Sequence, residues 1–178
     1  MGWILILNLL AIFFVLAVAV FVILMILPFF GVPWVPTSNK MSRRMFELAD
    51  LKAGETVVDF GCGEGALLIV AAKEFGANGI GYDHNPTLVL LGRLRARLAG
   101  VSDKVKVEQG NFFKLDMPPA DLVACYLFPE VQAKLEARLI EAYPSGTRVV
   151  SHDFQYPSLK LEKQKKYKKS TVYLYRIP

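Results

Sequence analysis

A chain of 178 residues has room for one modest folded domain, and its two widely spaced cysteines, outside any C-x-x-C pair, give no basis for a disulfide framework or a zinc site. Hydrophobic residues make up 53% of the sequence, but they are unevenly spread. The formal net charge of +5 belongs to one short run, because residues 160–169 contain six lysines and one glutamate and the remaining charges cancel.

The chain begins with an apolar span from Trp3 to Leu27, in which no residue is charged and Asn8 is the only strongly polar side chain. About 20 such residues cross a hydrocarbon core, so this span is long enough to do so with some tilt. A buried helix of a soluble domain would need partners on every side. A cleaved signal peptide would need a basic start, a shorter apolar core and a small-residue cleavage site. We therefore predict a single-pass membrane anchor over residues 1–30.

The charges that follow this span predict its orientation. Lys40, Arg43 and Arg44 come soon after it, whereas only the terminal amine is basic before it. The positive-inside rule then places the C-terminal domain in the cytoplasm of a prokaryote, or in the matrix if the membrane is mitochondrial. The basic run 160–169 either contacts anionic lipid or is a solvated loop or edge strand whose lysines prevent aggregation. Nucleic-acid binding is not expected, since no motif combines aromatic and basic residues.

Residues 31–55 are predicted to form a connector and a helix that begins after Thr37-Ser38, and residues 56–178 a single domain in which short apolar strands alternate with helices. We expect strands at 56–60, 79–83, 105–108, 122–126, 148–152 and 171–177, and helices at 66–75, 86–99 and 129–142. This alternation predicts an α/β fold with a Rossmann-like, doubly wound and mostly parallel sheet, covered by helices on both faces. Ligands of such sheets bind at the carboxyl ends of the strands.

The most informative segment is Val57–Gly65, in which a strand carrying Asp59 ends in a turn with glycine at every second position. The glycines let the backbone approach a ligand closely, and the helix that follows points its free N–H groups and positive dipole end at the turn. The pattern Gly61-x-Gly63-x-x-Ala66, with Asp83 downstream, also matches a dinucleotide fingerprint. A carboxylate at Asp59 would repel a pyrophosphate, however, and suits a cationic group such as the amine or sulfonium of S-adenosylmethionine.

Segment Val57–Gly65 resembles the first motif of class I S-adenosylmethionine-dependent methyltransferases, and Gly79–Asp83 resembles their second strand with its ribose-binding acid. A narrower resemblance is to the membrane-anchored protein lysine methyltransferases of ATP synthase c-subunit and adenine nucleotide translocase and their small prokaryotic relatives. It lies in the apolar N-terminus and in three motifs, Val35-Pro36-Thr37-Ser38, Gly81-Tyr82-Asp83-His84-Asn85-Pro86 and Tyr126-Leu127-Phe128-Pro129. The similarity covers roughly residues 30–155.

The resemblance implies S-adenosylmethionine as the cofactor, held by residues at the ends of the first three strands. These residues are Asp59, Gly61, Cys62, Gly63, Gly65, Asp83, His84, Asn111 and Phe112. Asp83 is expected to accept hydrogen bonds from the ribose hydroxyls. Asn111 is expected near the adenine, unless Gly110-Asn111 only forms a turn. Methyl transfer from a sulfonium requires no metal ion, and we expect none.

The same resemblance places the methyl acceptor beside the loop 126–129, which makes Tyr126 and Pro129 candidate catalytic residues. The ring of Tyr126 would stabilise a cationic ammonium by cation–π contact, or the residue would serve only as core packing. His152, at the end of a further predicted strand, is the third candidate. Together with Asp153 it would form a base and its orienting carboxylate, or a backbone carbonyl would satisfy the imidazole.

The predicted function is that of a membrane-anchored protein-lysine N-methyltransferase whose substrate is a small membrane protein. The anchor supports this substrate class, because tethering raises the effective concentration of a membrane-embedded target. Two alternatives stay open. One is a methyltransferase acting on a lipid, quinone or other small molecule at the membrane, and the other is a non-catalytic S-adenosylmethionine-binding membrane module.

Overall fold

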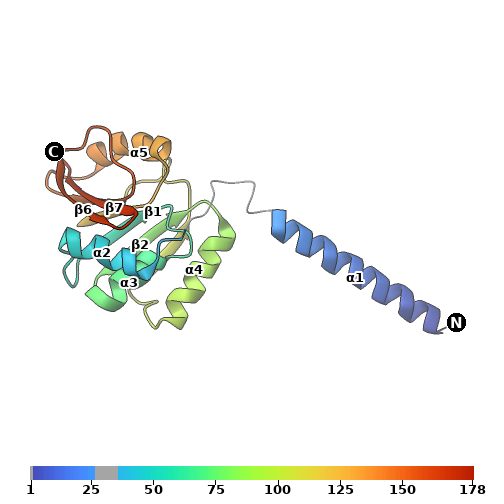
Figure 1. The fold of residues 1–178 in the computed structure, drawn as a ribbon. Coiled ribbons are helices and arrows are strands. Elements are labelled where there is room, and N and C mark those ends of the chain that lie inside the picture. Colours follow the sequence, from blue (N-terminus) through green and yellow to red (C-terminus); the bar gives the residue numbers. More distant parts are fainter. Residues whose placement is uncertain (1, 27–35) are drawn as a thin grey trace. The chain divides into compact units, whose positions relative to one another are not determined.

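The computed structural model describes residues 2–26 and 36–178, which belong to two compact units, Met1–Val35 and Pro36–Pro178 (Figure 1). The described part of the first unit is one helix, α1 (Gly2–Ile26), which is almost entirely apolar. Its stretch Gly2–Ile23 is long and apolar enough to cross a membrane by length and composition. Residues 1 and 27–30 of the predicted anchor and residues 31–35 of the predicted connector lie outside the described residues.

The second unit is organised around a seven-stranded sheet with the order β3-β2-β1-β4-β5-β7-β6. Its strands are β1 (Thr56–Phe60), β2 (Asn78–Asp83), β3 (Val105–Gln109), β4 (Leu122–Cys125), β5 (Arg148–His152), β6 (Leu161–Tyr167) and β7 (Ser170–Arg176). The first five strands are parallel, whereas β7 is antiparallel to both β5 and β6. This arrangement confirms the predicted mostly parallel α/β fold.

Helices cover both faces of this sheet, as predicted (Figure 1). One face packs against α2 (Asn39–Ala49), α3 (Ala66–Phe75) and α4 (Pro86–Leu98), and the other against α5 (Pro129–Ala142). The chain therefore turns to opposite faces after the neighbouring strands β1 and β4. In parallel sheets such a change of direction opens a crevice at the carboxyl ends of the two strands, where ligands bind.

Helix α2 forms where Thr37-Ser38 predicted a helix start. The side chain of Ser38 accepts a hydrogen bond from the Met41 N–H at 3.3 Å, which is an N-cap. Met45 and Phe46 are completely buried against the sheet and α3. The helix is thus part of the same compact unit as the sheet.

The predicted strands and helices of this unit begin and end within one residue of those observed. For the basic run 160–169 the sequence did not decide between a loop and an edge strand. The structure shows an edge strand, β6, which pairs with β7. Its residues are exposed apart from the half-buried Tyr167. A run of lysines on an edge strand opposes pairing with other chains, which is the second interpretation given for this run.

Candidate active site

The turn after β1 is built on glycines in the left-handed region. Gly61, Gly63 and Gly65 have φ angles of 80°, 53° and 72°, which side chains with a Cβ rarely adopt. The Gly61 N–H donates to the Tyr82 carbonyl at 2.8 Å. A Cβ added at Gly61 would lie 2.7 Å from Cδ2 of Leu127, in the loop after β4. The turn therefore lies close to both neighbouring strand ends, and a larger residue at position 61 would adopt a strained φ angle and displace the Leu127 side chain.

Asp83 joins the turns that follow β1 and β2. Its Oδ2 accepts a hydrogen bond from the Gly63 N–H and its Oδ1 accepts one from the Asn85 N–H, both at 2.9 Å. The residue is buried, whereas the His84 side chain beside it is 66% exposed, with Nδ1 3.6 Å from Asp83 Oδ1. Each carboxylate oxygen has a second lone pair, so Asp83 can hold both turns and still accept from ribose hydroxyls.

Asp59 is a buried carboxylate in β1. It is 2% exposed, and its Oδ2 has no hydrogen-bond partner in the part of the chain that the structure describes. Burial, with a smaller contribution from Asp83, raises the pKa of Asp59 to about 8. An orphaned carboxylate next to a glycine turn fits a ligand that carries positive charge. Burial also raises the pKa of the Cys62 thiol, so Cys62 packs against the turn as an inert thiol.

Asn111 and Phe112 follow β3. Oδ1 of Asn111 accepts from the Phe113 N–H at 3.0 Å, so the side chain caps its own turn, and its amide N–H groups can donate to a ligand. The half-buried ring of Phe112 lies 5.7 Å from the ring of Phe60, between centroids. Arg138 on α5 donates to the Phe112 carbonyl and fixes this turn. The turn interpretation of Asn111 is therefore seen in the structure, and Phe112 offers an aromatic wall beside it.

Aromatic side chains gather after the carboxyl ends of β4 and β5. The ring centroid of Tyr126 lies 4.2 Å from that of His152 and 6.2 Å from that of Phe154, and the Phe128 ring lies 6.3 Å from that of Phe154. We refer to Tyr126, Phe128, His152 and Phe154 as the aromatic cluster. The cofactor candidates follow β1, β2 and β3, and the cluster follows β4 and β5. Since β4 is the direct neighbour of β1, the two groups of residues lie side by side at the carboxyl ends of the strands. Aromatic faces attract ammonium groups through the ring quadrupole.

His152 is buried, and neither ring nitrogen makes a hydrogen bond within residues 36–178 as described. Its Nε2 lies 3.3 Å from Oδ2 of Asp153, a carboxylate that also accepts from the Thr171 N–H and the Ser170 hydroxyl. The alternative in which a backbone carbonyl satisfies the imidazole is therefore not seen. Burial lowers the pKa of His152 from its ordinary value against the opposing effect of Asp153, so the ring is neutral near pH 7 and can accept a proton.

Helix α5 holds the segment that carries Phe154. Pro129 is the first residue of α5 and is exposed, and its fixed φ suits a helix start. One turn further, Gln132 Nε2 donates to the Phe154 carbonyl at 3.0 Å. Glu136 Oε1 accepts from the N–H groups of residues 158 and 159 at 2.8 and 2.7 Å. These contacts were not predicted from the sequence, although two polar residues four positions apart on the apolar face of a helix are a signal for them.

Replacing Glu136 by alanine is expected to lower the melting temperature by about 5–10 °C, because two backbone N–H groups, one of them buried, lose their acceptor. Thermal unfolding of the detergent-solubilised protein followed by circular dichroism measures this effect. Glu141→Ala, at an exposed position near the end of the same helix, is the matched control. Equal melting temperatures for the two variants would show that Glu136 does not hold the segment.

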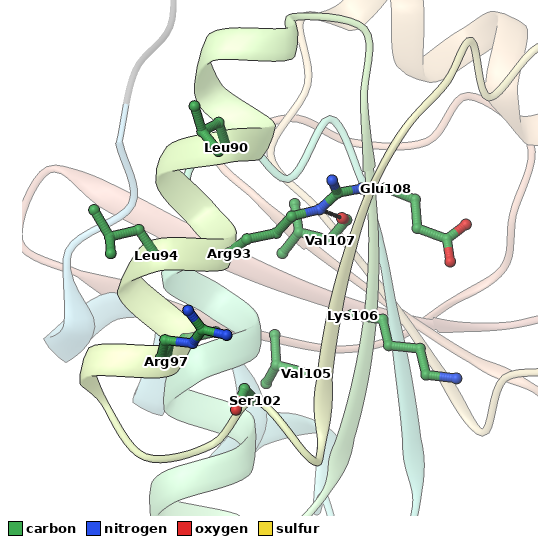
Figure 2. A pocket seen from close by; sticks show the side chains of 10 residues that line it. Leu90, Arg93, Leu94, Arg97, Ser102, Val105, Lys106, Val107 and Glu108 are labelled. Atoms are coloured by element: carbon green, nitrogen blue, oxygen red, sulfur yellow. Dashed lines mark hydrogen bonds between the residues drawn. The ribbon is translucent and has the colours of Figure 1, made fainter.

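A groove of about 500 Å³ lies on the outer flank of the unit, between α4 and β3 (Figure 2). Leu90 and Leu94 of α4 line it together with Arg97, and Arg93 crosses it to donate to the Val107 carbonyl at 2.7 Å. None of the twelve predicted site residues lines this groove. The candidate cofactor site lies instead at the glycine turn at the carboxyl ends of β1 and β2, where the Gly63 N–H donates to Asp83.

The fold and this site together define a class I S-adenosylmethionine-dependent methyltransferase. The crystal structure of an RNA methyltransferase from Salinibacter ruber with S-adenosyl-L-homocysteine is similar, with 40% sequence identity and a TM-score of 0.79 over 81% of this chain and 94% of that one. The chain belongs to the family of the ANTKMT methyltransferase domain, whose model matches residues 59–163. Its cofactor is S-adenosylmethionine.

Curated relatives of this family confirm the narrower resemblance to lysine methyltransferases. A protein-lysine N-methyltransferase of Saccharolobus islandicus is 34% identical over 151 residues, which are 82% of this chain and 94% of that protein. The adenine nucleotide translocase lysine N-methyltransferase of Mus musculus is 34% identical over 128 residues, which are 71% of this chain. The match spans only 55% of the length of that mouse relative.

Proposed function

We propose that this protein transfers methyl groups from S-adenosylmethionine to lysine side chains of a protein in or at a membrane. The observation that carries the acceptor class is the similarity to the Saccharolobus protein-lysine N-methyltransferase over nearly its whole length. The aromatic cluster beside the cofactor candidates supports it, because its ring faces suit the cationic end of a lysine.

The residues at the ends of β1, β2 and β3 would hold the cofactor, which supplies an electrophilic methyl group when bound. Asp59 would face the positively charged methionine portion, and the glycine turn would let the backbone approach it. Asp83 would accept from the ribose hydroxyls, with His84 at the rim of the adenine pocket. The amide N–H groups of Asn111 and the ring of Phe112 would contact the adenine.

The lysine must reach the methyl group with a free lone pair on Nζ. The Nζ–C bond then forms as the C–S bond breaks, and the amine loses one proton in total. The neutral imidazole of His152, whose Nε2 lies 3.3 Å from Asp153 Oδ2, can accept this proton, and solvent can take it if the lysine is deprotonated before it binds. Tyr126 would align the amine with its ring face, and Pro129 would shape the loop that carries it.

The membrane part of the proposal rests on α1. A helix of this length and composition would hold residues 1–30 in the bilayer, with residues 31–55 as a connector and helix and residues 56–178 as the methyltransferase domain. The basic residues after the span would keep that domain on the cytoplasmic side, or on the matrix side of a mitochondrial inner membrane. A tethered enzyme meets membrane-embedded acceptors at a raised effective concentration.

Replacing Tyr126 by alanine is expected to lower kcat/KM for a lysine acceptor about 10- to 100-fold, while the affinity for S-adenosylmethionine changes less than about threefold. The reason is that the ring belongs to the aromatic cluster and not to the turns that hold the cofactor. Tyr126→Phe keeps the ring face and should retain most of the activity. Steady-state methylation and calorimetric titration test this pair, and a phenylalanine variant as inactive as the alanine variant would assign the effect to the hydroxyl group.

RNA is the second candidate acceptor, because the 40%-identical Salinibacter structure is described as an RNA methyltransferase. The test uses the purified full-length protein, methyl-labelled S-adenosylmethionine and membranes with ribosomes from its own source, followed by separation into protein, lipid and RNA. We expect label in the protein fraction and none with Asp83→Ala. Label in the lipid fraction alone would support a lipid or quinone acceptor, and label in RNA alone would support the second candidate.

A further inference from the structure

The chain enters the second unit at the carboxyl ends of the parallel strands, the edge of the sheet that carries the active site. Helix α2 runs from this edge to the opposite one, as two contacts show. The Arg44 guanidinium carbon lies 4.3 Å from the ring centroid of Tyr167, at the end of β6, and the Ala49 carbonyl accepts from Arg148 Nη1 at 2.7 Å, at the start of β5. Since β5 and β6 are both antiparallel to β7, they run in the same direction, and α2 begins near their carboxyl ends.

A cluster of lysines lies at the same edge. Val172 pairs with both His152 and Lys165, so Lys165 is level with the end of β5 and about 10 Å from His152, at two strand spacings. The turn between β6 and β7 lies beyond Lys165. The hydroxyl of Ser170, the first residue of β7, donates to Asp153 Oδ2 at 3.3 Å. We refer to the exposed residues Lys165, Lys166, Lys168 and Lys169 as the basic tip.

The charge of the basic tip is not neutralised within the described residues. No ion pair there involves any of its four lysines. The oxygens of Asp153 accept from the Thr171 N–H and the Ser170 hydroxyl, and Glu162 pairs with Arg176 at the far end of the hairpin. Lys40, exposed in the first turn of α2, adds a fifth positive charge to this edge.

The covalent chain limits how far this edge can lie from a membrane that holds α1. Residues 27–38 connect α1 to α2, and they reach at most about 40 Å when fully extended. This distance is comparable with the diameter of a unit of this size. The chain enters the second unit at the carboxyl ends of the strands, so the tether joins the unit on the side that carries the active site.

We propose that the basic tip, together with Lys40, binds the headgroups of anionic phospholipids and so turns the active-site edge toward the bilayer. This inference rests on the membrane anchor of the proposed function. Each lysine near an anionic surface strengthens such contact about fivefold, and the attraction falls off within a Debye length. The anchor brings this lipid surface within reach, which favours lipid over nucleic acid as the partner of the lysines.

The full-length protein in nanodiscs provides the test. A donor dye on Gln164→Cys, beside the basic tip, reports energy transfer to a dye-labelled lipid, while Cys62 and Cys125 are buried. We expect transfer to rise about twofold or more when phosphatidylcholine discs receive about 30% phosphatidylglycerol, and the rise to vanish at about 0.5 M salt. A donor on Ser102→Cys, in the loop before β3 at the opposite edge, should show no such rise.

Two variants with equal charge loss complete the experiment. K165Q/K166Q/K168Q/K169Q should abolish the rise, whereas K52Q/K73Q/K104Q/K160Q, with all four changes at or near the amino ends of the strands, should keep it. Both should methylate a soluble lysine peptide at the wild-type rate, so loss of lipid contact is distinguished from failure of the proposed function. A rise that survives in the tip variant would overturn the proposal. Tip-dependent binding of single-stranded RNA in neutral discs without a lipid response would also overturn it, in favour of a nucleic-acid surface.

Discussion

Asp83→Ala is expected to weaken S-adenosylmethionine binding about 100-fold or more. The carboxylate accepts hydrogen bonds from the Gly63 and Asn85 N–H groups, so its removal loosens the turns after β1 and β2 together. It also removes the acceptor for the ribose hydroxyls. Hydrogen bonds to a charged group contribute about 1.5–3 kcal/mol each, and two of them account for this loss. Isothermal titration of the full-length protein measures the affinity.

Asp103→Ala is the matched control, because Asp103 is an exposed aspartate in the loop before β3, at the amino ends of the strands. Its affinity should stay at the wild-type value. Circular dichroism at the titration temperature should show that Asp83→Ala is folded, so that the loss belongs to the site. Wild-type affinity in a folded Asp83→Ala variant would mean that the cofactor does not contact the end of β2.

Asp59→Asn is expected to stabilise the cofactor-free protein at pH 9 and to weaken cofactor binding at least about tenfold. In the folded protein burial raises the pKa of Asp59 to about 8, whereas an unfolded chain has the ordinary value near 4. The stability contributed by the retained proton is complete below about pH 4 and is lost as the pH rises through about 8. Asparagine has the same shape and does not titrate, so it avoids this loss, which amounts to a few kcal/mol.

Thermal unfolding at pH 5 and pH 9 tests the stability part of this prediction, and titration with S-adenosylmethionine tests the binding part. The melting temperature of Asp59→Asn should exceed that of the wild type by more at pH 9 than at pH 5. Affinity should fall because the amide cannot neutralise the positive charge of the ligand. A variant that is less stable at pH 9 would show that Asp59 ionises freely in the folded protein.

The fold and the glycine turn after β1 were predictable from the sequence because they depend on short-range patterns. Glycines at every second position after an apolar strand require a tight turn, and an acid at the end of the next strand comes to lie beside it in a parallel sheet. The structure places Asp83 in contact with the turn at Gly63. The helix capped by Ser38 was equally predictable, but its burial against the sheet depends on packing that a single sequence does not reveal.

The acceptor side depends on contacts between distant segments. Phe154 lies beside Tyr126 with its carbonyl accepting from Gln132 of α5 and from the Ser151 hydroxyl, while Glu136 of α5 binds the segment that follows. The sequence does not distinguish strand β6 from a loop, because its lysines do not alternate with apolar residues. Its pairing with β7 makes it a strand. The position of this hairpin beside the active site follows from strand order, which local patterns do not specify.

The proposed reaction places the methyl group on a lysine nitrogen of a protein in or at the membrane. Its most direct test is to incubate native membranes with the full-length enzyme and methyl-labelled S-adenosylmethionine, hydrolyse the protein fraction to amino acids, and separate them by chromatography. We predict that the label elutes with Nε-methylated lysine and is absent with Asp83→Ala. Label on another amino acid, or an unlabelled protein fraction beside labelled lipid or RNA, would contradict the claim.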